Sequence, residues 1–287
     1  MSQKTKKAFS LIELSIVILI IGLLVAGVVK GQQLYRKMQL TSAQNITVSS
    51  PVNRTADLKM WLETSLKSSF VNNINDGDLV AIWNDQKLDQ KSVISPSQST
   101  QANKPTFKEN VYNGIPGLKF DGTNDYLPYD GSFLVNSDYT IFVVDMRGSN
   151  KSQNYFIGGS GGSPNSILHL GYRSASAVTQ AHYFNDMDVT ITPTIGINQI
   201  YLHVFRFSKT EGKFYRFYQN DHSLNYGDAE QTSPLVAYNG FVGRGGGVNY
   251  YNGHLFEIIV FKRALKNNER EAIENYLGQK YSIKIVR

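Results

Sequence analysis

The chain of 287 residues contains no cysteine, and only 18% of its residues are charged. The absence of cysteine excludes disulfides, thiolate chemistry and cysteine-ligated metals. The five histidines also lack the paired spacing of a zinc site; they stand at positions 169, 182, 203, 222 and 254. A folded body of more than 200 residues nevertheless buries enough surface to be stable without cross-links.

A strong positive charge is lacking as well. Lysine and arginine number 29 against 23 acidic residues, a formal charge of +6. Without the first eight residues, which hold three lysines, 26 basic residues remain and the side-chain charge falls to +3. This balance gives no reason to expect a nucleic acid partner. Two glycine clusters, 158–162 and 243–247, lack the Lys-Ser/Thr ending of a phosphate-binding loop.

A long apolar run near the N-terminus is the most informative feature. Residues 9–29 carry a single charged side chain, Glu13. As a helix this run is roughly 31 Å long, enough to cross the hydrocarbon of a bilayer. Lipid offers no partners for backbone N–H and C=O groups, so such a segment must be helical. We therefore predict a membrane-spanning helix at this position.

The negative charge of Glu13 within this apolar run is expected to have a partner. A carboxylate inside an apolar membrane helix costs about 2.5 to 3.5 kcal/mol, and ionisable groups in such segments are usually paired. Glu13 follows closely on a basic tail that ends in Lys7 and Ala8. Cleavage between Ala8 and Phe9 would create an α-amino group as its partner. That amine could meet Glu13 of the same helix or Glu13 of a neighbouring subunit.

The segment KAFSLIEL, residues 7–14, closely resembles the class III signal of type IV pilins and pseudopilins. In that family a prepilin peptidase removes the basic leader, the new N-terminal phenylalanine is N-methylated, and a glutamate near the new terminus guides filament assembly. The resemblance implies cleavage after Ala8, methylation of Phe9, and assembly with other pilins or pseudopilins through Glu13. Ala8 departs from the glycine that the family usually has, although it is also small.

A secretory signal peptide and a plain signal anchor are the alternative interpretations of this segment. The apolar run exceeds the roughly 7 to 15 residues of a secretory core, and a plain anchor gives no reason for an acidic residue near its start. Basic residues flank the run on both sides, so charge alone does not set the orientation. The resemblance implies a single-pass protein of the bacterial inner membrane, with its head periplasmic or on an extracellular filament.

The apolar run is expected to continue as a stalk helix. Leu34 and Met38 give residues 30–48 an apolar side at helical spacing. The helix should end before Pro51, because a residue that precedes proline disfavours the α region. We expect a leader at 1–8, a transmembrane and stalk helix at 9–50, and a head at 51–287.

The head has the pattern of a mainly β protein. Runs rich in β-branched and aromatic residues occupy 139–145, 200–207, 214–218 and 254–261, and turn dipeptides such as Asn113-Gly114 separate short strands. Such spacing indicates an antiparallel sandwich or jelly roll. Residues 267–280 have helical periodicity, which predicts a C-terminal helix.

Ordered segments along the head resemble a known family. They include MWL at 60–62, WND at 83–85, LKFDGTNDYL at 118–127, LHLGYR at 168–173 and YNGHLFEIIVF at 251–261. Together they are similar to bacterial laminin-G-like domains, which are concanavalin A-like jelly rolls. The resemblance implies two facing antiparallel sheets with a terminal helix.

Catalysis and metal binding have little support. A glycosidase needs two carboxylates about 5 to 9.5 Å apart. Asp76 and Asp78 flank a glycine and indicate a turn, and we expect Asp186 and Asp188 in a surface loop. Glu257 and Asp145 are isolated acids on strands, and Glu257 is interpreted as a structural carboxylate. We expect no enzyme activity and no cofactor. Calcium is the open alternative, with weak candidate ligands at Asp121, Asn124 and Asp125, which also suit a hairpin turn.

Ligand recognition is expected in the loops, because a rigid β scaffold commonly presents binding residues on its connections. Aromatic rings stack well on sugars, although most tyrosines of a β protein cover its sheets. The candidate residues for a carbohydrate or surface-protein ligand are Tyr172, Tyr183, Asp186, Asp188, Tyr250 and Tyr251.

These features together predict a minor type IV pilin or pseudopilin that displays a laminin-G-like head for adhesion or ligand binding. A head of this size is awkward to repeat along a tightly packed fibre, which favours a minor subunit. A pilus, a secretion pseudopilus and a DNA-uptake filament all fit the pattern. The alternatives are a membrane-tethered glycan-binding adhesin outside any filament and, with less support, a tethered glycosidase.

Overall fold

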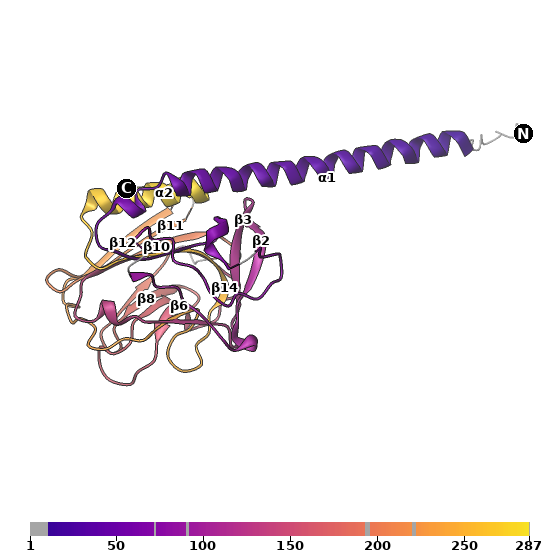
Figure 1. Cartoon of the computed structure of the whole chain (residues 1–287). Helices are drawn as coiled ribbons and strands as arrows, with labels where there is room; N and C mark the ends of the chain where they lie inside the picture. Colours follow the sequence, from indigo (N-terminus) through magenta and orange to yellow (C-terminus); the bar gives the residue numbers. More distant parts are fainter. Residues whose placement is uncertain (1–10, 72, 90–91, 193–195, 220–221, 287) are drawn as a thin grey trace, which may run out of the picture.

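A computed structural model describes residues 11–71, 73–89, 92–192, 196–219 and 222–286. A long helix, α1 (Leu11–Val48), projects from a two-layered β head (Figure 1). Cleavage and methylation were predicted at Ala8 and Phe9, which lie outside the described residues.

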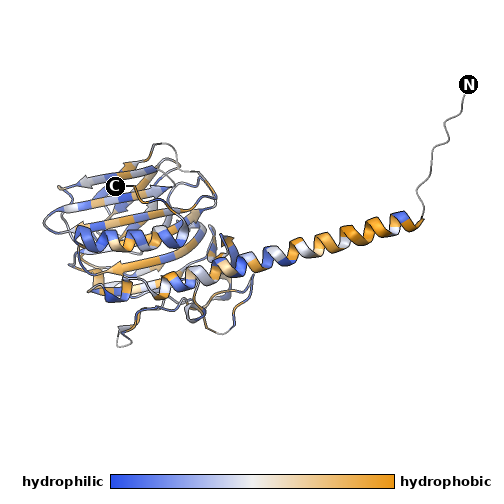
Figure 2. Cartoon of the chain, turned by 90° about the horizontal axis from the view of Figure 1, so that it is seen from above, coloured by the Kyte–Doolittle hydropathy of each residue, from blue (hydrophilic) through white to orange (hydrophobic). Residues whose placement is uncertain are grey.

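Helix α1 confirms the predicted long N-terminal helix. Every described residue from 11 to 38 is exposed, and the far half of the helix is almost uniformly apolar (Figure 2). In the part of the chain that the structure describes, α1 is the one helix long and apolar enough to cross a membrane. It ends three residues before Pro51, close to the predicted end.

Two antiparallel sheets form the head and confirm the predicted sandwich. The eight-stranded sheet has the order β12-β11-β10-β5-β14-β3-β2, and β1 also pairs with β14. Its strands are β1 (Leu58–Glu63), β2 (Thr106–Tyr112), β3 (Ile115–Asp121), β5 (Tyr139–Arg147), β10 (Tyr201–Ser208), β11 (Gly212–Gln219), β12 (His222–Asp228) and β14 (Asn252–Phe261).

The six-stranded sheet has the order β4-β13-β6-β7-β8-β9. Its strands are β4 (Leu127–Tyr129), β6 (Asn154–Gly159), β7 (His169–Tyr172), β8 (Ala177–Ala181), β9 (Asp186–Thr190) and β13 (Gly240–Val242). Short 3-10 helices lie at Val52–Arg54, Lys67–Ser69, Gln101–Asn103 and Ser132–Leu134.

Strand β5 shows why the eight-stranded sheet needs cover on both faces. All nine of its residues are buried. Ile141 and Val143 point into the core between the sheets, whereas Phe142 and Val144 belong to a second core on the opposite face. A strand with two apolar faces cannot leave either of them in water without losing the free energy of apolar burial.

The second core is closed by two helices that cross the eight-stranded sheet side by side (Figure 2). One is the predicted C-terminal helix, α2 (Asn267–Tyr281), which contributes Ile273 and Leu277. The other is the end of α1, which contributes Ala43. The last turns of the anchor helix are therefore part of the hydrophobic core of the head.

Candidate functional site

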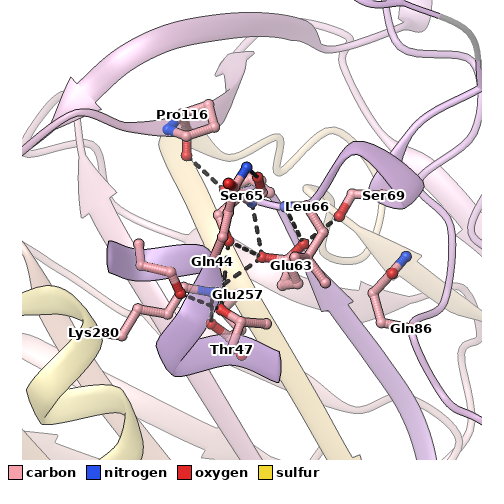
Figure 3. Close-up of polar contacts among 12 residues, drawn as sticks. Gln44, Thr47, Glu63, Ser65, Leu66, Ser69, Gln86, Pro116, Glu257 and Lys280 are labelled. Carbon is pink, nitrogen blue, oxygen red and sulfur yellow. Dashed lines mark hydrogen bonds and ion pairs between the residues drawn. The ribbon is translucent and has the colours of Figure 1, made fainter. Parts of the chain in front are cut away.

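A buried polar network joins the helices to the sheet (Figure 3). Strands β1 and β14 supply Glu63 and Glu257, and α2 supplies Lys280. The Lys280 Nζ atom donates to Glu63 Oε2 at 3.1 Å and to Glu257 Oε2 at 2.8 Å, and all three side chains have 0% exposure. One cation thus holds two carboxylates from neighbouring strands.

The remaining carboxylate oxygens in this network are also satisfied. Glu257 accepts hydrogen bonds from Trp61 Nε1 and the Tyr276 hydroxyl, each at 2.7 Å, and from Tyr281. The Tyr281 hydroxyl lies 3.0 Å away. Glu63 accepts from the backbone N–H and the hydroxyl of Ser65, the N–H of Leu66 and the hydroxyl of Ser69.

The charges in this network outweigh the cost of burial. Burial alone would lower the pKa of Lys280, but Glu257 and Glu63 raise it. Burial would raise the pKa of Glu63, but the charge of Lys280 and the hydrogen bonds from Ser65 and Ser69 lower it. Lys280 and Glu63 therefore stay ionised at neutral pH. The network is sealed from solvent, so its carboxylates serve structure, as predicted for Glu257.

Helix α1 is tied to the same region. Gln44 Nε2 donates to the Ser65 backbone oxygen at 2.8 Å. Thr47 is fully buried, and its hydroxyl lies 3.5 Å from the hydroxyls of Ser65 and Tyr276. The end of α1 therefore contacts the segment directly after β1, at Ser65, and helix α2, at Tyr276, which couples the stalk to the head.

A second polar network lies between the two sheets and corrects part of the predicted ligand site. Asp145 accepts hydrogen bonds from His203 Nε2 at 2.9 Å and from the hydroxyls of Tyr172 and Tyr251 at 2.9 and 2.7 Å. Burial, with the charge of Asp145, raises the pKa of both tyrosines well above its usual value. Tyr172 and Tyr251 each have 0% exposure, so they are interior donors and do not form a surface platform.

The predicted calcium residues build a turn. Asp121 Oδ1 accepts the backbone N–H groups of Thr123 and Asn124 at 2.8 and 3.1 Å, and Asp125 Oδ2 accepts that of Asp121 at 3.0 Å. Burial and the neighbouring charge of Asp121 raise the pKa of Asp125 to about 6. Within the described ranges, no group of three or more histidine or acidic residues is arranged to hold a metal.

The structure corrects the predicted loop at Asp186 and Asp188. Both lie on β9, the edge strand of the six-stranded sheet, where they alternate with buried Met187 and Val189. Period-two alternation places the two aspartates on one face of the strand. Because Met187 and Val189 belong to the core between the sheets, both carboxylates lie on the outer face.

Other side chains share this face of the six-stranded sheet. Cross-strand pairing sets Tyr155 opposite Gly171, Gly171 opposite Thr179, and Thr179 opposite Asp188. The next row runs from His169 through Ala181 to Asp186. We call the polar members of these rows, with Arg173 at the end of β7, the outer-face cluster: Tyr155, His169, Arg173, Thr179, Asp186 and Asp188.

Short contacts organise the outer-face cluster. Arg173 Nη1 donates to the Tyr155 hydroxyl at 3.0 Å, and Arg173 Nε lies 3.5 Å from Asp188 Oδ2. The ring of His169 stacks on Tyr155 at 4.7 Å, and His169 Nε2 accepts the N–H of Gly246 at 3.0 Å. Burial and the charge of Arg173 lower the pKa of His169 to about 4, so this imidazole is neutral at physiological pH.

An aromatic turn borders the outer-face cluster. Tyr183 and Phe184 are the two central residues of the turn between β8 and β9, and the N–H of His182 donates to the Asn185 oxygen at 3.2 Å. Their rings are 4.3 Å apart, and Phe184 is 70% exposed. Predicted Tyr183, Asp186 and Asp188 thus lie in one hairpin, with Tyr183 in its turn and both aspartates on β9. Tyr250 packs elsewhere, with its ring 6.2 Å from Tyr126 and 5.3 Å from the Arg244 guanidinium carbon.

Sequence reasoning missed Phe184 and Arg173 as members of this surface. The alternation from Asp186 to Thr190 was the signal that could have placed the aspartates on a strand. The partners across the sheet carry no comparable signal, because strand register is not encoded in local periodicity.

Near the N-terminus, Glu13 lies in the first turn of α1 and is exposed. Residues 3–29 match the family model of the prokaryotic N-terminal methylation motif. No curated protein sequence matches the chain significantly.

Solved structures resemble the head in fold. Domain 4 of AbnA, a GH43 extracellular arabinanase from Geobacillus stearothermophilus in complex with arabinotriose, is 11% identical with a TM-score of 0.50; the match covers 76% of this chain and 97% of that one. Trypanosoma rangeli sialidase in complex with 2,3-difluorosialic acid is 14% identical with a TM-score of 0.53, over 85% and 38% of the two chains.

A GH54 α-L-arabinofuranosidase soaked with a cyclic sulfate inhibitor is 11% identical with a TM-score of 0.54, over 80% of this chain and 64% of that one. The chain thus spans 38% of the sialidase and 64% of the arabinofuranosidase. At these identities the likeness concerns the fold. The chain joins a prepilin-type methylation motif and a single apolar N-terminal helix to an antiparallel β-sandwich head.

Proposed function

We propose that this protein is a minor type IV pilin or pseudopilin subunit whose sandwich head serves adhesion by binding a ligand, with carbohydrate as the favoured class. Prepilin peptidase would cleave after Ala8, and Phe9 would become the methylated N-terminus of the mature chain. The observation that carries the proposal is the methylation motif at residues 3–29, whose described part, from Leu11 onward, lies on an exposed apolar helix.

The exposed helix supports assembly with other subunits. Large apolar side chains such as Leu11, Ile12 and Leu23 are 66% to 84% exposed. Contiguous apolar surface of this extent marks a membrane or protein contact. Lipid covers it before assembly, and the helices of neighbouring subunits would cover it in a filament.

The junction between helix and head suits a protein that displays its head. Ala43 and Thr47 are buried in the head, so the orientation of the sandwich follows that of the helix. An anchored helix would therefore present the same face of the head in every subunit. A flexible linker would not give that result.

In this proposal the head binds its ligand without cleaving it. Glu63 and Glu257 are sealed and fully bonded. Asp186 and Asp188 alternate on one face of β9, a spacing that a glycosidase pair could use, but Asp188 is ion-paired with Arg173 at 3.5 Å. Glycan turnover by the purified protein would contradict this part of the proposal and support a tethered glycosidase.

N-terminal mass spectrometry tests the pilin assignment. In a host with active prepilin peptidase, the membrane-bound protein should begin at N-methylated Phe9, and in a peptidase-deficient host it should begin at Met1. An intact Met1 in the presence of the active peptidase would overturn the proposal.

Glu13→Ala distinguishes a filament subunit from a tethered adhesin. The variant should remain in the membrane fraction but lose at least tenfold in co-purification with sheared filaments, because the assembly carboxylate is gone. Ser15→Ala, two residues away on the same exposed helix, is the matched control and should assemble normally. Equal surface assembly of Glu13→Ala would favour the tethered adhesin.

A further inference from the structure

The outer face of the six-stranded sheet is covered by neither helix, and Gly245 and Gly246, from the connection between β13 and β14, pack on its Tyr155 and His169. Helices α1 and α2 cover the outer face of the eight-stranded sheet, whereas β6 and β8 lie on the side of the head away from both helices (Figure 1). Because the stalk is packed into the head, this face points away from the anchor helix. It is where a displayed subunit would meet a ligand.

The outer-face cluster has polar atoms that the protein leaves unsatisfied. Thr179 is completely buried, and its Oγ1 atom has no hydrogen-bond partner among the described residues. The Oδ1 atom of Asp186 is likewise buried and unbonded within that part of the chain. Buried polar atoms are almost always bonded in folded proteins. The two atoms lie on adjacent strands and on one face, in neighbouring rows, because Thr179 is opposite Asp188 and Asp186 is opposite Ala181.

The turn beside the cluster breaks a local rule. Tyr183 and Phe184 have φ angles of 45° and 68°, the arrangement of a type I′ hairpin turn, for which Asn-Gly is strongly preferred. Positive φ is strained for bulky residues. Packing of the Phe184 side chain offsets little of this backbone strain, because the residue is 70% exposed. Local violations of this kind are expected at functional sites.

We propose that the aromatic turn and the outer-face cluster form a binding site for a neutral oligosaccharide. Phe184 supplies the stacking surface for a sugar ring. Asp186 and Asp188 accept hydrogen bonds from vicinal hydroxyls, and Arg173, which is 40% exposed on its side chain, donates to them. This inference rests on the proposed ligand-binding role of the head and names the surface and the ligand class.

Charge selects a neutral sugar over an acidic one. The two aspartates are offset by Arg173, which pairs with Asp188, and by Lys213, whose charge acts on Asp186. Lys213 is buried and donates to the Asn185 backbone oxygen, so it is not available to a ligand. The site therefore has no excess of positive charge, and a sugar carboxylate would meet two aspartates.

Binding to the full-length protein in detergent micelles tests the site. The probes are arabinotriose, galactotriose and cellotriose as neutral oligosaccharides and 3′-sialyllactose as an acidic one, measured by isothermal titration calorimetry. At least one neutral probe should bind, and sialyllactose should bind at least tenfold more weakly. Failure of every neutral probe, or tighter binding of sialyllactose, would overturn the inference.

A double substitution separates binding from structure. Tyr183→Asn with Phe184→Gly installs the preferred turn sequence, so the melting temperature should stay the same or rise while affinity falls at least tenfold. Asp188→Asn should also weaken binding at least tenfold. Tyr226→Ala, which removes an exposed aromatic ring from β12 of the other sheet, is the control and should bind normally.

Two results for the double variant would refute the assignment. Unchanged affinity would remove the aromatic turn from the site. A lower melting temperature would show that the two rings hold the hairpin together, which is a structural role. Neither result would affect N-terminal processing or filament assembly, so failure of this site is distinguishable from failure of the pilin proposal.

Discussion

Replacing Lys280 by methionine tests whether the buried ion network joins the helices to the sheet. Methionine keeps most of the side-chain volume but removes the cation, which leaves Glu63 and Glu257 at 0% exposure without their shared partner. Removing one partner of a buried pair costs about 3 to 5 kcal/mol. Against a total stability of about 5 to 15 kcal/mol, that is a large fraction. For a head of this size it corresponds to a fall of roughly 6 to 20 °C in melting temperature.

The pH dependence sharpens this prediction. The pKa of Glu63 is lowered in the folded state, so its stabilisation is present above the unfolded value of about 4.5 and is lost as pH falls through the folded pKa. The pKa of Lys280 is raised, so its stabilisation is present below about 10.5 and is lost as pH rises through the folded pKa. The native chain should therefore be most stable between these limits.

The variant should behave differently. Without the cation, burial raises the pKa of at least one of the two carboxylates, and the folded state must bind a proton to remain stable. The penalty of Lys280→Met should therefore be smallest near pH 5 and grow as pH rises toward 8.

Tryptophan fluorescence during urea unfolding measures this penalty directly. The chain has two tryptophans, and both are at the network: Trp61 donates to Glu257, and Trp83 donates to the backbone oxygen of Glu63 at 2.7 Å. Lys119→Met, at an exposed position of β3, is the matched control. A penalty below about 1 kcal/mol at pH 7, or one that does not change with pH, would refute the reasoning.

Three further perturbations test the helix junction, the turn at Asp125 and the N-terminus. Ala43→Glu places a charge at a residue that is only 2% exposed, so the end of α1 should detach from the head. Proteolysis between residues 49 and 57 should then accelerate at least tenfold. Ser42→Glu, at the exposed neighbouring position, is the control and should not have this effect. Asp125 has a folded pKa of about 6 against an ordinary 3.8, so its ionisation weakens the fold as pH rises from 3.8 through 6. Asp125→Asn should abolish that loss and raise the melting temperature by a few degrees at pH 7.5, and an unchanged pH profile would contradict this account. Glu13→Ala should reduce filament incorporation while membrane insertion continues, as quantified by filament shearing.

The sequence by itself determined the elements whose causes are local. An apolar run of 21 residues has to be helical in lipid, because lipid cannot satisfy its backbone. Alternating and continuous apolar runs predicted β5, β10, β11 and β14 within a few residues, because side-chain direction repeats every two residues along a strand. The C-terminal helix and the methylation motif could also be predicted from the sequence, because each is contained in one contiguous segment.

Tertiary structure decided what each polar residue does. Lys280 meets Glu63 across 217 positions of the chain, and no local pattern reports such a pairing. Tyr172 is on a strand face directed into the core, whereas Asp188 is on a face directed outward. A shift of one residue in register would exchange these faces. Register is fixed by how two sheets and two helices share their apolar surfaces, so the candidate binding site exists only in the folded chain.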